Sequence, residues 1–129
     1  MESPRVLLAD DLPGMLETVT YLLRDDCEIV GYAQDGEDAI KAATTYNPDL
    51  LVLDIEMPFR NGFQVASHLR DSGCRAKMIF LTVHEDLDYV EAARSVGALG
   101  YVLKSRIATD LLPAVRAVLQ GRRFTSSFQ

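Results

Sequence analysis

Residues 50–58 read LLVLDIEMP, and the first five of them set a pattern that recurs along the chain. The run Leu50–Asp54 is apolar up to its last residue and rich in branched side chains, which is typical of a strand buried on both faces of a parallel sheet. It ends abruptly at Asp54. A lone aspartate at the end of a strand is ordinary turn chemistry. A wider role for Asp54 therefore depends on which other residues reach the same edge of the sheet.

Similar apolar runs recur in four other places, at Arg5–Ala9, Glu28–Ala33, Lys77–Thr82 and Leu99–Leu103. The segments between them carry apolar residues at helical spacing, as in Met15, Val19 and Leu22. Pro13 suits a first helical turn, and Asp35 suits a helix N-cap. Strand and helix thus alternate five times, which predicts an α/β fold with a parallel sheet covered by helices on both faces.

The bulk composition narrows the class of protein. A chain of 129 residues suits one domain, and 48% hydrophobic with 25% charged residues predicts that it folds. The net charge of −6 argues against direct nucleic-acid binding, which needs a basic surface. No apolar run approaches the roughly 18 residues of a membrane span, and the N-terminus lacks the pattern of a signal peptide. Cys27 and Cys74 fit reduced thiols, with one disulfide as the alternative, so we expect a cytoplasmic protein without membrane contact.

Polar residues follow four of the five predicted strands. In a parallel sheet the carboxyl ends of the strands share one edge, so these side chains should meet there: Asp10 and Asp11, Asp54, Thr82, and Lys104. Each has a simpler interpretation. Asp11 could be a helix N-cap before Pro13, Thr82 could fill a strand, and Lys104 could be a solvated charge or an ion-pair partner. Their convergence favours one functional site.

Electrostatics indicates what such a site would bind. Two carboxylates about 4 Å apart repel by about 4 kcal/mol at an effective dielectric constant of 20. A divalent cation relieves this repulsion, and oxygen ligands without histidine or cysteine favour Mg²⁺, or Mn²⁺ in its place, over zinc. Beside such a cation Asp54 could act as a nucleophile toward phosphorus and form an aspartyl phosphate.

The motifs LLADD (7–11), LVLDIEMP (51–58) with Gly62, FLT (80–82) and GYVLK (100–104) resemble those of the response-regulator receiver domains of bacterial two-component systems. The resemblance covers essentially the whole chain. It implies a flavodoxin-like (CheY-like) three-layer α/β/α sandwich, with strand order 2-1-3-4-5 and five helices. It also implies roles for individual residues: Asp54 as phosphoacceptor, Asp10, Asp11, Asp54 and the backbone carbonyl of Glu56 as Mg²⁺ ligands, and Thr82 and Lys104 as phosphoryl contacts.

The same resemblance makes Tyr101 the aromatic switch residue that turns inward with Thr82; a rim aromatic with a wet hydroxyl is the alternative. Three positions depart from the usual pattern. Ser105 replaces a common proline, so a cis peptide bond is not expected. Val83 is larger than the usual alanine or glycine and should narrow access to Asp54. The Glu56 side chain should disfavour an approaching phosphodonor.

The end of the chain resembles the NarL-type subclass, in which a LuxR-type helix-turn-helix output domain follows the receiver. We therefore expect a receiver domain over 1–121 and the start of a linker or tail over 122–129. The expected function is a signalling switch, phosphorylated by a sensor histidine kinase and controlling transcription through a DNA-binding domain in the same protein, with homodimer formation on phosphorylation. Such a protein is not an enzyme beyond its own phosphorylation and dephosphorylation. The alternatives are a stand-alone receiver, a phosphotransfer intermediate, a docking module and an aspartyl-phosphate phosphohydrolase.

Two histidines and a pair of arginines complete the candidates. His84 lies in an acidic loop and is interpreted as solvated, and His68 is expected on an exposed helix face. Arg122 and Arg123 are interpreted as a solvated helix end.

Overall fold

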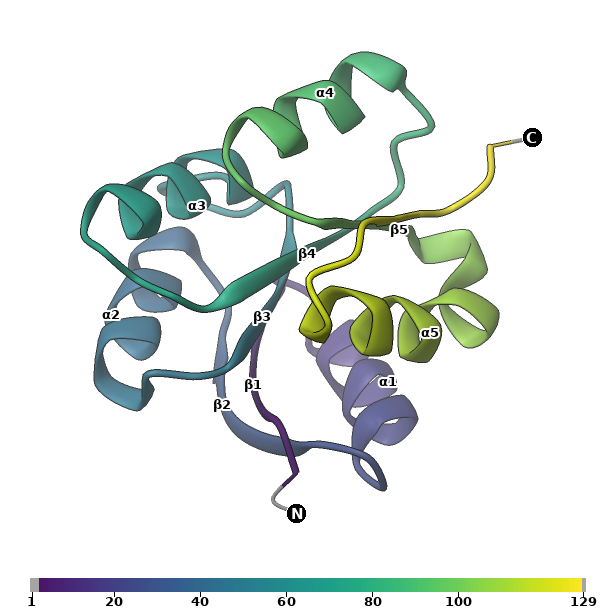
Figure 1. Ribbon diagram of the computed structural model, residues 1–129. Helices are drawn as coiled ribbons and strands as arrows, with labels where there is room; N and C mark the ends of the chain where they lie inside the picture. Colours follow the sequence, from purple (N-terminus) through teal and green to yellow (C-terminus); the bar gives the residue numbers. More distant parts are fainter. Residues whose placement is uncertain (1–2, 129) are drawn as a thin grey trace.

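The computed structural model describes residues 3–128, and within them strands and helices alternate along the chain (Figure 1). The strands are β1 Arg5–Ala9, β2 Glu28–Ala33, β3 Leu50–Asp54, β4 Lys77–Thr82, β5 Gly100–Leu103 and β6 Phe124–Thr125. The helices are α1 Pro13–Leu23, α2 Gly36–Tyr46, α3 Gly62–Asp71, α4 Leu87–Ser95 and α5 Ile107–Leu119, with a 3₁₀ turn over Lys104–Arg106. The five predicted strands are confirmed, β5 beginning one residue later than expected.

The strands form one parallel sheet in the order β2-β1-β3-β4-β5-β6. This confirms the predicted CheY-like order and adds a short sixth strand. At the carboxyl edge the register aligns Ala9 with Leu53, and Thr82 with Leu103. The residues that follow these strands therefore emerge side by side.

Two hydrophobic clusters join the sheet to the helices on its two faces, which gives three layers. One face of the sheet packs against α2, α3 and α4, and the opposite face packs against α1 and α5 (Figure 1). Neighbouring strand residues alternate between the two clusters, so Leu7 faces the first and Leu8 the second. Because both faces are covered, the central strands are buried along their whole length, which explains their continuous apolar sequence. Cys27 and Cys74 are free thiols, as expected.

The helix ends confirm two expectations, at Pro13 and Asp35, and exclude one alternative interpretation. Pro13 opens α1, and the Asp35 side chain caps α2 by accepting a hydrogen bond from the Asp38 N–H at 2.8 Å. Asp11 does not cap α1: the N-cap residue is Leu12, which makes no side-chain capping bond. The Leu12 N–H instead donates to Asp10 Oδ1 at 2.9 Å. Within the described residues no peptide bond is cis, as expected with Ser105 after Lys104.

The C-terminal residues were expected to begin a linker, yet Phe124–Thr125 pair with β5 as the sixth strand. Sequence periodicity could not indicate this strand, because two residues have no period. The boundary at residue 121 stays a prediction, and residues 1, 2 and 129 of the two predicted segments lie outside the described residues. Arg122, Arg123 and His68 are exposed, as expected.

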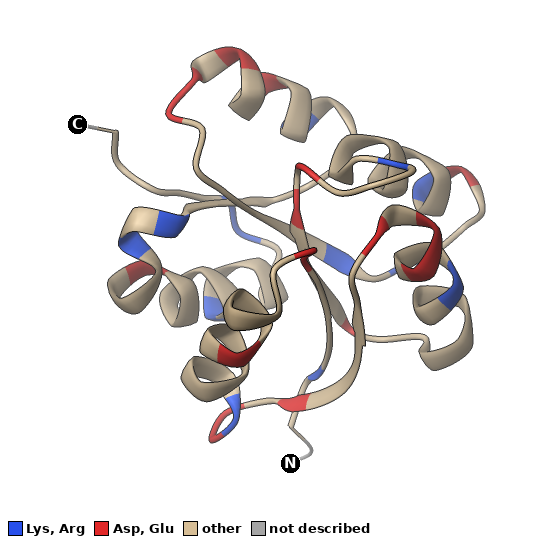
Figure 2. Cartoon of the chain, turned by 180° about the vertical axis from the view of Figure 1, so that it is seen from behind, with Lys and Arg blue, Asp and Glu red and all other residues tan. Residues whose placement is uncertain are grey.

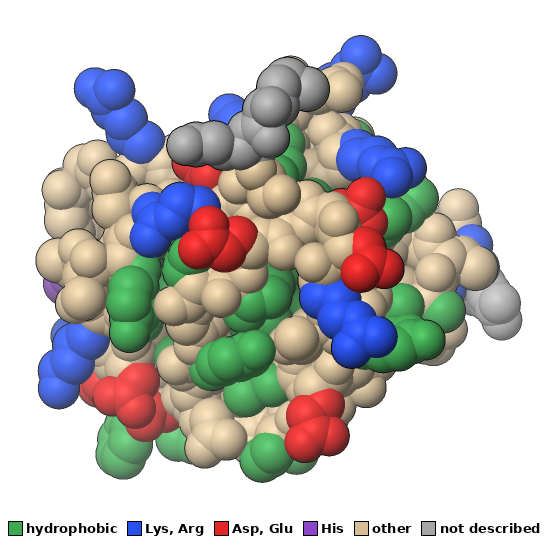
Figure 3. All heavy atoms as spheres, turned by 90° about the horizontal axis from the view of Figure 1, so that it is seen from below, with side chains coloured by type: hydrophobic (Ala, Val, Ile, Leu, Met, Phe, Trp, Pro, Cys, Tyr) green, Lys and Arg blue, Asp and Glu red, His purple; other side chains and the backbone are tan. Residues whose placement is uncertain are grey.

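Charge is mixed on the face from which the N-terminus emerges, where basic, acidic and apolar side chains lie beside one another (Figure 3). Among residues 3–128, the longest helix has 13 residues, and none of the helices combines the length and apolar character of a bilayer crossing.

Candidate functional site

The predicted site residues meet at the carboxyl edge of the sheet. Asp10 and Asp11 follow β1, Asp54 ends β3, Thr82 ends β4 and Lys104 follows β5. One carboxylate oxygen from each of the three aspartates lies within 4.8 Å of the others. Acidic segments from neighbouring strand ends meet near the centre of Figure 2. The fold thus gathers residues that are 44 positions apart in sequence, from Asp10 to Asp54.

Lys104 lies between two of these carboxylates. Its ammonium Nζ is 3.0 Å from Asp10 Oδ2 and 3.2 Å from Asp54 Oδ2. Asp10 is 3% exposed and Asp54 is 7% exposed, whereas Asp11 is exposed to solvent. The simpler interpretation of Lys104 as a solvated charge is therefore wrong, because its side chain is largely buried in the ion pairs.

Burial and charge crowding set the ionisation of the two central groups. Burial raises the pKa of Asp54, and the Asp10 charge acts in the same direction, whereas Lys104 and the Glu56 N–H lower it only in part. Burial alone would lower the pKa of Lys104, but its hydrogen bond to Asp10 and the charges of Asp54 and Asp10 raise it overall. An ion-paired aspartate usually has a lowered pKa; the opposite direction at Asp54 follows mainly from burial, to which the nearby charge of Asp10 adds.

The acidic cluster fits a hard divalent cation. Asp10 Oδ2 is buried, and among the described residues it has no well-aligned hydrogen-bond donor beyond the Lys104 ion pair. With three carboxylates against one ammonium, the cluster carries an excess of negative charge. Clustered carboxylate oxygens are the ligands that Mg²⁺ prefers. The residues present therefore suit the predicted metal.

Thr82 and Tyr101 are joined through the loop after β4. Thr82 is buried, and its Oγ1 accepts a hydrogen bond from the His84 N–H at 3.1 Å. The Tyr101 hydroxyl donates to the His84 carbonyl at 2.7 Å, and burial raises the pKa of Tyr101 to about 12. The alternative of a rim aromatic with a wet hydroxyl is wrong, because Tyr101 is buried and its hydroxyl is bonded to protein. The switch role itself stays a prediction.

His84 is the residue that sequence reasoning missed. It was interpreted as solvated, but its Nε2 contacts the Glu56 carboxylate and its ring lies 4.3 Å from that of Tyr89. Its backbone also joins Thr82 to Tyr101. The available signal was its position two residues beyond a strand end, which places it at the edge of the site.

Two features hold the loop after β3 close to the site. The Glu56 N–H donates to Asp54 Oδ1 at 3.3 Å, while the Glu56 side chain points to His84. A Cβ on Gly62 would lie 2.5 Å from the Asp54 carbonyl oxygen, so only glycine allows α3 to begin this close to β3. Val83 is 68% exposed at the rim.

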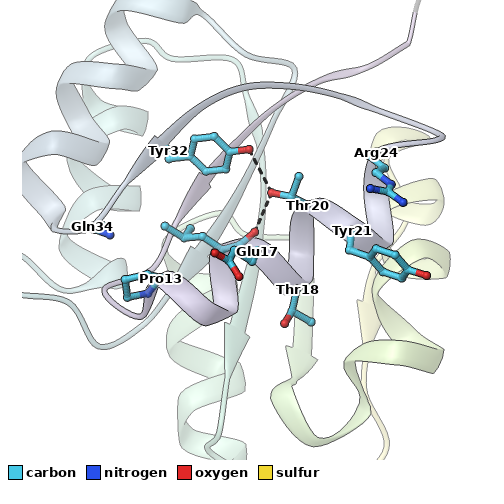
Figure 4. A pocket seen from close by; sticks show the side chains of 9 residues that line it. Pro13, Glu17, Thr18, Thr20, Tyr21, Arg24, Tyr32 and Gln34 are labelled. Carbon is cyan, nitrogen blue, oxygen red and sulfur yellow. Dashed lines mark hydrogen bonds between the residues drawn. The ribbon is translucent and has the colours of Figure 1, made fainter.

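A larger concavity lies elsewhere, between α1 and β2. It is a groove of about 740 Å³ lined by residues that include Glu17, Tyr21, Arg24 and Tyr32 (Figure 4). The Thr20 hydroxyl donates to the Tyr32 hydroxyl at 3.2 Å across it. The acidic cluster is therefore a separate feature, defined by charge rather than by depth.

Comparisons with known proteins show the family of the chain. A protein-family model described as "Response regulator receiver domain" matches residues 6–116. The uncharacterized transcriptional regulatory protein YvfU of Bacillus subtilis is 38% identical over 124 residues, covering 95% of this chain and 62% of that protein. The nitrate/nitrite response regulator protein NarL of Escherichia coli is 33% identical, covering 97% of this chain and 59% of that protein. The chain thus spans about three fifths of the length of the curated relatives it matches.

Solved structures show the same fold. The signal receiver domain of the putative response regulator NarL from Mycobacterium tuberculosis has a TM-score of 0.90 at 31% identity, covering 95% of this chain and all of that one. A LuxR-family two-component response regulator from Aurantimonas sp. SI85-9A1 has a TM-score of 0.89 at 31% identity, covering 95% of this chain and 89% of that one.

Proposed function

The chain belongs to the response regulator receiver domain family, and from this premise we propose that Asp54 accepts a phosphoryl group from a sensor histidine kinase. A receiver domain of two-component signalling is not an enzyme in the usual sense, so the phosphohydrolase alternative is set aside. The observation that carries the proposal is the Lys104 ammonium between Asp10 and Asp54, inside a cluster of carboxylates.

The chemistry follows from this geometry. A carboxylate oxygen of Asp54 attacks the phosphorus of a phosphohistidine. The O–P bond forms as the N–P bond breaks, and the electron pair of that bond returns to the imidazole nitrogen. Lys104 lies close enough to exchange its contact with Asp54 for one with the transferred group, and Thr82 ends the neighbouring strand with its hydroxyl at the same edge.

Asp10, Asp11, Asp54 and the Glu56 backbone carbonyl would hold Mg²⁺, or Mn²⁺ in its place, and the bound cation would neutralise charge on the phosphoryl oxygens. The direct check is the Mg²⁺ affinity of Asp11→Ala, which should fall well below that of the wild type. An unchanged affinity would show that the exposed Asp11 is an ordinary turn residue and not a metal ligand.

The proposed output is control of transcription. YvfU is named a transcriptional regulatory protein and NarL a response regulator protein, and both extend well beyond the matched part. We therefore extend the proposal to a DNA-binding output domain in the same protein, with receivers forming a homodimer on phosphorylation. A receiver over 1–121 and a linker from 122 belong to the same proposal. The alternatives of a stand-alone receiver and a phosphotransfer intermediate differ from it only in the output.

The experiment that tests the phosphoacceptor is incubation with a panel of histidine kinases and labelled ATP. We expect the wild type to gain a base-labile label that Asp54→Asn lacks, because the asparagine amide is a poor nucleophile. Asp25→Asn, an exposed aspartate after α1, is the matched control and should label like the wild type. A label that persists in Asp54→Asn would contradict the proposal.

A docking module without phosphorylation is the remaining alternative. Beryllofluoride with Mg²⁺ mimics a phosphoryl group on a carboxylate, and it should shift the NMR signals of Thr82 and Tyr101. An absence of these shifts in the wild type would favour the docking module.

A further inference from the structure

The C-terminal segment, residues 124–128, follows α5, and its first two residues form β6 beside β5. The Phe124 N–H donates to the Leu99 carbonyl at 3.0 Å, and the Ser126 N–H donates to the Tyr101 carbonyl at 2.9 Å. In Figure 1 this segment is drawn in yellow next to the β5 label, and its first residues pair in parallel with β5. Strand β5 carries Tyr101 and is followed at once by Lys104, so the segment contacts the strand that connects these two residues.

Ser126 is the centre of this contact. It is 3% exposed, and its Oγ accepts a hydrogen bond from the Leu103 N–H at 3.0 Å. β6 pairs only with Gly100 and Tyr101, so the Ser126 hydroxyl supplies the acceptor that a longer strand would have given to Leu103. A buried N–H without an acceptor is costly, so this bond holds the end of β5 in place. Leu103 is the residue directly before Lys104.

A buried carboxylate on α5 holds Ser126 in turn. The Ser126 hydroxyl donates to Asp110 Oδ2 at 2.6 Å. Asp110 is 8% exposed, and it also accepts bonds from Arg106 Nε at 3.0 Å and from the Thr109 hydroxyl at 3.1 Å. The Ser126 hydroxyl therefore accepts one hydrogen bond, from Leu103, and donates another, to Asp110, which fixes its orientation. The polar lock, comprising Ser126 and Asp110, connects α5 to the end of β5.

The segment also reaches the candidate switch residue. The Phe128 ring lies 6.3 Å from the Tyr101 ring, centroid to centroid, and packs against the hydrophobic cluster that contains Tyr101. Tyr101 is turned inward, with its hydroxyl bonded to the His84 carbonyl. Docking of Phe128 thus stabilises the inward orientation of Tyr101.

We infer that the C-terminal segment is a positioning element of the phosphoacceptor site: the polar lock holds Lys104 through Leu103, and Phe128 holds Tyr101 inward. This inference rests on the proposed function. Because coupling between two sites is reciprocal, a docked segment strengthens phosphoryl binding at Asp54, and phosphorylation strengthens docking of the segment. Whatever follows residue 129 in a longer protein would be held in a phosphorylation-dependent way.

The test is the affinity of the full chain, residues 1–129, for beryllofluoride in the presence of Mg²⁺. We expect Ser126→Ala to weaken this affinity by about fivefold or more, the lower end of typical coupling between sites. Phe128→Ala, which removes no buried polar group, should weaken it as well. Ser127→Ala, at the exposed neighbouring residue, is the matched control and should bind as the wild type does.

Two further measurements separate positioning from general damage. The affinity for Mg²⁺ alone should change far less than that for beryllofluoride in all these variants, since the polar lock reaches the proposed Mg²⁺ ligands only indirectly, through Lys104. In the wild type, exchange of the Phe124 and Ser126 amide hydrogens should slow when beryllofluoride binds. A parallel loss of Mg²⁺ affinity, an unchanged or tighter beryllofluoride affinity in Ser126→Ala and Phe128→Ala, or an unchanged exchange rate would overturn the inference. A wild type that does not bind beryllofluoride would instead refute the proposed function.

Discussion

Asp54 and Asp110 are both buried aspartates beside a basic side chain, yet their pKa values move in opposite directions. Burial raises the pKa of Asp54, and its neighbours compensate only in part. Burial also acts to raise the pKa of Asp110, but hydrogen bonds from Ser126, Arg106 and Thr109 outweigh it and hold the pKa below the ordinary value. The difference lies in what opposes burial: at Asp54 the Asp10 charge adds to the effect of burial, and Lys104 and one N–H do not overcome it, whereas at Asp110 three hydrogen-bond donors do.

The comparison separates a reactive site from a structural one. A carboxylate that accepts several hydrogen bonds is stabilised and less reactive, as at Asp110 with its three donors. A crowded carboxylate gains free energy by binding a cation or by forming a bond to phosphorus, as we propose at Asp54. Unbalanced charge in a buried cluster of ionisable groups therefore indicates function better than burial alone does.

The largest expected effect comes from removing the cation of the crowded cluster. Lys104→Ala should lower the rate of phosphotransfer to Asp54 by about 100-fold or more, the usual effect of losing one preorganised charge at a reacting group. Phosphotransfer from a labelled kinase measures it. Lys41→Ala, at an exposed lysine on α2, is the control and should keep the wild-type rate. A rate equal to that of the wild type would show that Lys104, like Asp110, has a structural role.

The next effect concerns Asp110, the aspartate whose carboxylate accepts several hydrogen bonds. Asp110→Asn should lower the free energy of unfolding at pH 7 by about 1.5–3 kcal/mol, because it weakens hydrogen bonds to a charged group. The folded-state pKa of Asp110 is lowered, so its stabilising effect is present above the unfolded value of about 3.9 and is lost as pH falls through the folded value. Denaturant unfolding from pH 7 downward measures it. A difference that does not shrink in acid would show that charge is not its source.

Asp54→Asn should have the opposite and smaller effect. The folded-state pKa of Asp54 is raised, so ionising it costs stability, and this cost is complete above the folded value and absent below the unfolded one. Without Mg²⁺ we expect the variant to be more stable than the wild type by about 1 kcal/mol at pH 7, because burial and the Asp10 charge both oppose ionisation of Asp54, and like charges about 4 Å apart repel by about 1 kcal/mol even in water. The gain should vanish in acid. A loss of stability at pH 7 would mean that Lys104 already balances the cluster.

The smallest effect is at the rim. Val83→Ala should speed phosphorylation by a small donor such as acetyl phosphate, and self-dephosphorylation, by a few-fold, because it opens the approach to Asp54. Glu56→Asn should act in the same direction by removing a charge held by His84. Both rates can be followed with labelled acetyl phosphate, and rates equal to those of the wild type would show that access does not limit the chemistry.

Much of the fold followed from the sequence because buried parallel strands are continuous apolar runs, as in Leu50–Leu53. The convergence of Asp10, Asp54 and Lys104 followed because parallel strands end at one edge. What escaped prediction depends on tertiary contacts. β6 is too short to show a period, and Ser126 looks like any tail serine until Asp110 meets it.

Two local features also depend on tertiary contacts. Asp11 precedes a helix, so capping was the simpler alternative to metal binding, but the loop is organised by Asp10 Oδ1 and the Leu12 N–H instead. His84 lies in a polar loop, and only the fold shows that Glu56 and Tyr89 lie beside it.

The sixth strand also changes what the sheet can do at its margins. It covers part of the β5 edge, so within residues 3–128 the longer open margin is β2, at the other side of the sheet. There the register jumps from Ile29 to Gly31, leaving Val30 without a partner residue on β1. A regular ladder is the template on which a foreign strand adds, and an interrupted ladder is a poor one. The β5 edge of the sheet is thus partly covered by β6, and the β2 edge carries the register shift at Val30. Both features disfavour the addition of strands from other molecules.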